Sequence, residues 1–79
     1  MARDYYADSR ALGVDLWEAG FKDWADRIDA VIEGGSTSSE ILMGLRWTLT
    51  QLDAEEQDLP QSLRLRAESL RNEIDAVLS

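Results

Sequence analysis

The spacing of apolar residues constrains the fold of this chain more than any other feature of its sequence. Three breaks divide the chain, at Gly20, at residues 34–39 and at residues 53–60. Between the breaks, apolar residues recur every three or four positions, which is the period of an α-helix with one buried face. The pattern therefore predicts an all-α protein with helices at about 4–19, 21–33, 38–52 and 60–78.

Chain length limits how these helices can be arranged. A chain of 79 residues builds one small core and no deep substrate cleft, so we expect a single domain. Short connections between amphipathic helices favour a compact antiparallel four-helix bundle, with the third helix in a central position. Because the chain has no cysteine, packing must stabilise it without disulfide bonds.

Local signals mark the ends of the predicted helices. Gly20 suits the left-handed conformation that commonly ends a helix. Thr37 followed by Glu40 has the spacing of a capping box at the start of the third helix. Pro60, with its fixed φ, suits the first position of the last helix. These residues predict short turns between the helices and no long linker.

Hydropathy indicates where the protein works. No apolar run approaches the ~20 residues that a membrane span needs, so we expect no membrane insertion. Residues 1–6 carry neither an apolar signal core nor a small-residue cleavage site. The sequence therefore favours a cytoplasmic protein.

Negative charge is concentrated in the first part of the chain. Residues 1–58 hold thirteen Asp and Glu against five Lys and Arg, whereas residues 59–79 hold three of each class. A surface of this kind repels nucleic acid and anionic lipid and attracts a basic protein. The charge distribution predicts a basic protein partner and no nucleic-acid partner.

The inventory of reactive side chains argues against catalysis. The chain has no histidine and no cysteine, so its serines lack a base to activate them. Asp53, Glu55, Glu56 and Asp58 gather oxygen ligands, but they lack the glycine and the distal glutamate of a helix–loop–helix calcium site. We expect no enzyme, no cofactor and no metal ion, and a solvated acidic loop at these four residues.

Acidic residues of the second helix are candidates for binding a partner. Asp26, Asp29 and Glu33 share the face opposite its apolar stripe. They could be the ordinary solvated face of an amphipathic helix. However, like charges along one face repel each other, so an uncompensated row suggests a use. We therefore group these three acids with Asp53, Glu55, Glu56 and Asp58 as a candidate partner-binding surface.

Met43 and Trp47 form an apolar pair on the third helix, nearly opposite its leucine stripe. A helix in the middle of a bundle touches two neighbours, so we expect this pair to be packed in the core. Exposure would instead make the pair an anchor for a partner, because tryptophan in an apolar patch is typical of interfaces. Both residues are therefore also candidate partner-binding residues.

Three segments resemble small acidic helical immunity proteins of bacteria, which bind and neutralise a toxic effector. They are AGFKDWA at 19–25, GGSTSSEILM at 34–43 and LRW at 45–47, and they are similar to proteins of contact-dependent growth inhibition systems. The chain also resembles colicin-type immunity proteins in length and acidity. It lacks their Tyr-Tyr pair in the third helix, since its own pair is Tyr5-Tyr6, so no binding residue is transferred.

Two hypotheses follow for the function. The resemblance implies an inhibitor of a basic toxin, which agrees with the acidic charge. The alternative is a non-enzymatic adaptor that self-associates as a weak homodimer through Met43 and Trp47, its acids serving only solubility.

Overall fold

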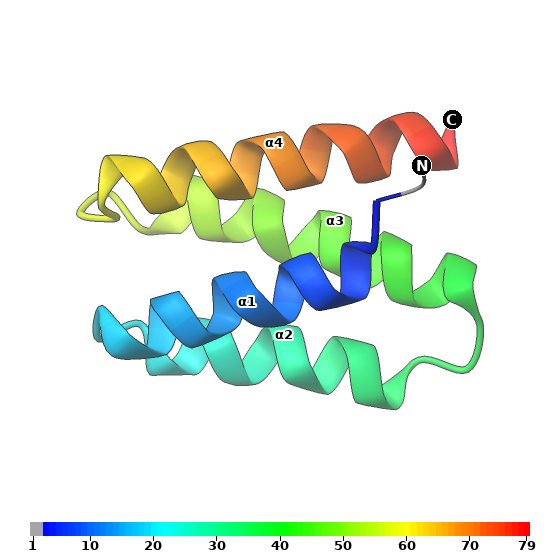
Figure 1. Ribbon diagram of the computed structural model, residues 1–79, viewed down its shortest axis with the longest axis horizontal. Helices are drawn as coiled ribbons and strands as arrows, with labels where there is room; N and C mark the ends of the chain where they lie inside the picture. Colours follow the sequence, from blue (N-terminus) through cyan, green and yellow to red (C-terminus); the bar gives the residue numbers. More distant parts are fainter. Residues whose placement is uncertain (1–2) are drawn as a thin grey trace.

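The computed structural model describes residues 3–79. Four helices are present: α1 (Tyr5–Glu18), α2 (Lys22–Gly34), α3 (Ser38–Glu55) and α4 (Gln61–Leu78). Successive helices run in opposite directions and are joined at alternate ends of the molecule (Figure 1). The predicted all-α antiparallel four-helix bundle is thereby confirmed. No helix within residues 3–79 combines the length and the apolar run that crossing a membrane requires.

The helices form a closed ring in which each packs against two others. α1 lies against α2 and α4, and α3 also lies against α2 and α4. The prediction that the third helix is central is therefore wrong. Each helix contributes one apolar stripe to a shared core, so the second apolar side of α3 has no helix to cover it.

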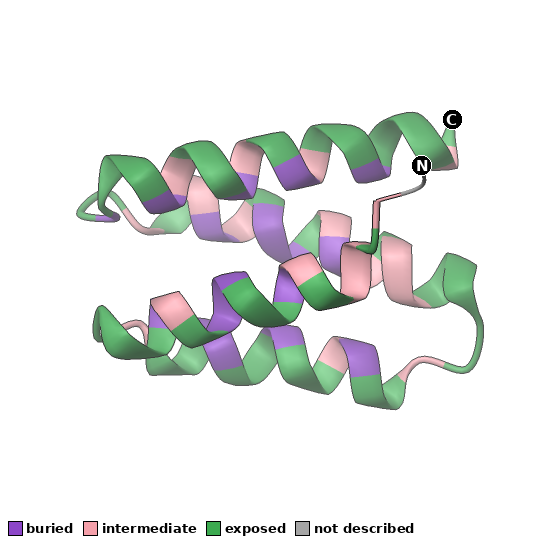
Figure 2. Cartoon of the chain, in the orientation of Figure 1, coloured by how far each residue is buried: buried purple, intermediate pink, exposed green. Residues whose placement is uncertain are grey.

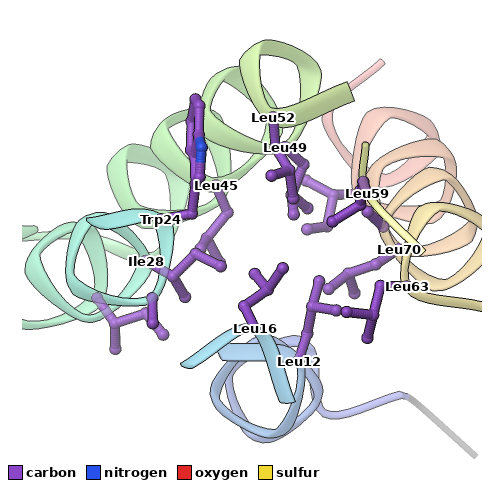
Figure 3. Packing of buried hydrophobic residues seen from close by; sticks show 14 residues of the cluster. Leu12, Leu16, Trp24, Ile28, Leu45, Leu49, Leu52, Leu59, Leu63 and Leu70 are labelled. Atoms are coloured by element: carbon purple, nitrogen blue, oxygen red, sulfur yellow. The ribbon is translucent and has the colours of Figure 1, made fainter. Parts of the chain in front are cut away.

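The core is built from leucine and isoleucine at the predicted helical spacing. Leu16, Ile28, Leu45 and Ile74, one from each helix, are fully buried. Buried positions line the inner faces of the helices in Figure 2. In Figure 3 the labelled leucine side chains and Ile28 point toward a common centre, whereas the Trp24 indole lies alongside α3. The remaining buried apolar residues are Leu12, Trp24, Ala25, Ile32, Leu49, Leu52, Leu59, Leu63, Ala67 and Leu70.

Most helix ends follow their sequence signals. Gly20 has φ 96°, the left-handed conformation expected there. The Thr37 hydroxyl accepts a hydrogen bond from the Glu40 N–H at 3.2 Å, and the Glu40 carboxylate accepts one from the Ser36 N–H at 3.1 Å. This is the predicted capping box, except that the Glu40 carboxylate accepts from the N–H of Ser36 and not from that of the N-cap residue, Thr37. Pro60 is the N-cap of α4, one position before the first helical residue.

α3 continues past its predicted end at residue 52 because a residue of α4 caps it. Arg64 donates hydrogen bonds to the carbonyl oxygens of Asp53, at 3.1 Å, and of Glu56, at 2.6 Å. It also pairs with the Asp53 carboxylate. Carbonyl groups at a helix C-terminus lack partners within the helix, and a guanidinium can satisfy several of them. Asp53 and Glu55 therefore belong to the last turn of α3. The prediction that they lie in a loop is wrong.

Ion pairs gather along α4. Apart from Arg3 with Asp8, every ion pair among residues 3–79 has one partner on α4. These pairs are Arg3–Glu73, Arg46–Asp75, Arg64–Asp53 and Arg66–Asp15. Partly exposed pairs of this kind each contribute at most about 1 kcal/mol, so their main effect is on the charge of the surface. They neutralise acids on the α4 side of the bundle.

Candidate functional site

The outer face of α2 carries acids that the fold does not neutralise. Asp26, Asp29 and Glu33 follow one another at spacings of three and four residues, which places them on one side of the helix. All three are exposed, and none forms an ion pair with any residue from 3 to 79. We call these three residues the α2 acid stripe. By contrast, Asp8 and Asp15 of α1 are both paired with arginine.

The acids predicted to form one loop have four different environments. Asp53 is held by Arg64, and the Glu56 carboxylate accepts a hydrogen bond of 3.0 Å from the indole N–H of Trp24. Glu55 and Asp58 are exposed, the first on α3 and the second in the connection to α4. Two of the four acids thus have structural partners. Within the described part of the chain, no group of three or more acidic side chains is placed to hold a metal ion.

A shallow groove of about 390 Å³ lies where the α1–α2 turn meets the end of α3. Asp23, Glu55 and Glu56 line it together with two cations, Lys22 and Arg27. The Arg27 guanidinium also lies over the ring of Trp24, 4.4 Å from its centre. Because cations and acids are mixed here, this end of the molecule offers a weaker negative field than the α2 acid stripe.

Met43 and Trp47 are exposed, so the prediction that they pack in the core is wrong. Met43 is 47% exposed and Trp47 is 63% exposed. The reason is that α2 contacts α3 at a different position, where Val31 packs against Gly44. The pair instead lines a groove of about 360 Å³ between α3 and α4, here called the α3–α4 groove. Its other lining residues are Arg46, Thr50, Arg71, Asn72 and Asp75.

The candidate residues therefore do not form one continuous surface. Asp29 of the α2 acid stripe and the pair Met43 and Trp47 line different grooves, formed by different helices. Glu55 and Glu56 line the groove at the α1–α2 turn. A single partner does not need to contact all three of these sites, so a binding role has to be assigned to one of them.

Sequence reasoning missed a further groove, between α1 and α2. It has a volume of about 430 Å³, and two exposed apolar side chains line it, Val14 at 57% and Trp17 at 47%. The helical period alone places Trp17 on the flank of the apolar stripe of α1 and does not indicate a role for it. We call this the α1–α2 groove; its lining residues are Arg10, Gly13, Val14, Trp17, Glu18, Ala25 and Asp29.

Charged groups surround the apolar part of the α1–α2 groove. Glu18 and Asp29 line it as acids, against Arg10 as the one cation of the lining. The Lys22 ammonium lies 5.2 Å from the centre of the Trp17 ring. A cation over an indole face is attracted by the ring quadrupole, so this tryptophan already serves as a platform for positive charge.

Comparison with family models, with curated proteins and with solved structures finds no match for this chain. A function must therefore be proposed from the surfaces described above.

Gly13 gives a test of whether the α1–α2 groove is empty space within the fold. A methyl group added at Gly13 would meet no atom within 4 Å among residues 3–79 beyond its own turn of helix. Glycine inside a helix is less stable than alanine by roughly 0.5–1 kcal/mol. We expect Gly13→Ala to raise the free energy of unfolding by about that amount, as measured by urea denaturation. A loss of stability would show that the space is filled.

Proposed function

We propose that this protein is a cytoplasmic immunity-type inhibitor that binds and neutralises a cationic bacterial toxin domain through its acidic surface. It acts by binding and not by catalysis, and it uses neither a cofactor nor a metal ion. The observation that carries the proposal is the α2 acid stripe, whose three carboxylates are exposed and unpaired among residues 3–79.

Unpaired acids on one helix face favour a binding role over a purely structural one. Acids three and four residues apart on a helix repel each other by roughly 0.2–0.5 kcal/mol per pair. Four ion pairs neutralise acids on α4 or on segments that face it, whereas no ion pair among residues 3–79 includes an acid of the α2 acid stripe. Complementary charge speeds association to about 10⁸ M⁻¹s⁻¹ or more at low salt. An inhibitor of a toxic enzyme benefits from such speed.

The proposal predicts that a neighbouring gene encodes a secreted protein with a basic C-terminal domain, and that domain is the partner to test. That domain should arrest growth when expressed alone, and this protein should restore growth when co-expressed. Affinity should fall by at least about tenfold when ionic strength rises from about 50 to about 500 mM, because exposed charges are screened. Affinity independent of salt, or a gene without such a neighbour, would contradict the proposal.

Charge-removing variants locate the surface within this test. Replacing Asp26 and Asp29 by asparagine and Glu33 by glutamine should lower the affinity at least about tenfold, mainly through slower association. The matched control removes the same charge from α4, by Glu68→Gln, Glu73→Gln and Asp75→Asn, and should change affinity much less. Equal losses in both variants would show that net charge matters and the α2 acid stripe does not.

The exposure of Met43 and Trp47 favours a second candidate function, self-association as an adaptor. An apolar pair at 47% and 63% exposure is available to a second copy of the chain. Sedimentation at micromolar concentration separates the two candidates. A stable dimer that buries this pair favours the adaptor, and a monomer favours the inhibitor.

A further inference from the structure

We propose that the α1–α2 groove receives an apolar side chain from a basic helical segment of the partner, so that Trp17 anchors the complex. This inference rests on the proposed function, since it supplies the apolar contact that an acidic surface alone lacks. Charge steers encounter and sets specificity, whereas buried aromatic anchors in pockets carry most of the binding free energy. The groove provides such an anchor beside the α2 acid stripe.

Small residues and exposed apolar residues shape the groove for a side chain. Gly13 and Ala25, from facing helices, are buried residues of its lining. Val14 and Trp17 line the same groove with about half of their surface exposed. Covering tryptophan and valine would remove apolar area from water at about 25 cal/mol per Å². A single aliphatic or aromatic side chain fits this arrangement.

Gly13 is not explained by packing within the bundle. At Gly44 an added Cβ would lie 2.7 Å from a methyl group of Val31, so close contact between α2 and α3 requires glycine there. At Gly13, an added Cβ would meet nothing within 4 Å beyond its own helical turn in the described chain. A glycine in mid-helix costs stability, and here the fold gains no contact in return. What Gly13 does provide is the depth of the groove.

Charge complementarity selects a basic occupant for this groove over the α3–α4 groove. Two acids of the lining, Glu18 and Asp29, are balanced by Arg10 and by the Lys22 ammonium over the Trp17 ring. The negative charge next to the α1–α2 groove comes from the α2 acid stripe, which Asp29 joins to the groove. The lining of the α3–α4 groove holds one more cation than acids, since Arg46 and Arg71 face Asp75. The Nε of Arg71 is also buried without a hydrogen-bond partner among the described residues. A basic segment would be repelled there and attracted to the α1–α2 groove.

Selection from a displayed library of random helical peptides tests the proposal without a known partner. Peptides retained by the wild-type protein at low salt should carry lysine or arginine around an apolar residue. Gly13→Leu fills the groove, and it should lower their affinity at least tenfold, as should Trp17→Ala. The matched control, Leu65→Ala with Val77→Ala, removes exposed apolar side chains of α4 that line none of the grooves described above, and it should leave affinity unchanged. Thermal unfolding must show that Gly13→Leu is no less stable than the wild type.

The outcomes distinguish failure of the groove from failure of the acidic surface. One outcome is that basic peptides bind Gly13→Leu as tightly as the wild type and yet lose affinity when the α2 acid stripe is neutralised. That result would overturn the α1–α2 groove as the anchor and would leave the proposed function standing. Retained peptides that are not basic, and whose binding ignores salt, would count against both. A library from which no peptide is enriched would overturn the groove as an anchor.

Discussion

Leu45→Ala is expected to lower the free energy of unfolding by about 2–5 kcal/mol. Leu45 lies in the centre of α3 and is 0% exposed, with its side chain directed at the shared core (Figure 3). Removing three buried carbons loses their transfer free energy and leaves a cavity that the surrounding helices only partly close. A domain of 79 residues has a total stability of roughly 4–12 kcal/mol, so this variant should be marginally folded.

The same substitution at an exposed leucine is the matched control. Leu65 of α4 is 56% exposed, and Leu65→Ala should change stability by less than about 0.5 kcal/mol. Urea denaturation followed by far-ultraviolet circular dichroism measures both variants. Similar losses at the two positions would show that Leu45 does not occupy the core described here.

The sequence was sufficient to predict the four helices and most of the core. The helical period alone places Leu12, Leu16, Ile28 and Leu49 on the apolar faces of their helices, and all four are buried. Periodicity works here because each helix of a ring buries one stripe, so local pattern and tertiary environment agree. Turn signals such as Gly20 succeed for the same reason, since they act within a few residues.

Features set by distant residues could not be predicted. The end of α3 depends on Arg64, whose guanidinium reaches back eleven residues to the Asp53 carbonyl. Burial of Met43 depends on which neighbours flank α3, and spacing within one helix does not contain that information. The negative charge of Asp15 is neutralised by Arg66, which lies 51 residues away in the sequence. Each case requires the packing of helices to be known first.

The candidate site was predictable in its charge and not in its apolar part. Asp26, Asp29 and Glu33 were identified from spacing, because an exposed face needs only the helical period. The groove with Trp17 went unnoticed, because it forms between two helices whose facing positions are not visible in either one. A glycine in mid-helix, four residues before a tryptophan, is the sequence signal that could have indicated it.

Gly44→Val is expected to lower the free energy of unfolding by about 1–3 kcal/mol, because the added side chain would collide with α2. A Cβ at this position lies 2.7 Å from Cγ1 of Val31, and a β-branched side chain in a helix has little freedom to move aside. α2 and α3 would have to separate or repack. The identical change at Gly13, where an added Cβ would meet no atom within 4 Å among residues 3–79 outside its own turn of helix, should cost less.

A double-mutant cycle attributes the loss to this one contact. Val31→Ala removes the methyl groups that the new side chain would strike, so the double variant Val31→Ala with Gly44→Val should be more stable than the sum of the single changes predicts. Residues in direct contact show interaction energies of about 0.5–3 kcal/mol in such cycles. Urea denaturation of the four proteins measures the term. Strict additivity would mean that Gly44 is required for another reason, and that the α2–α3 approach does not depend on it.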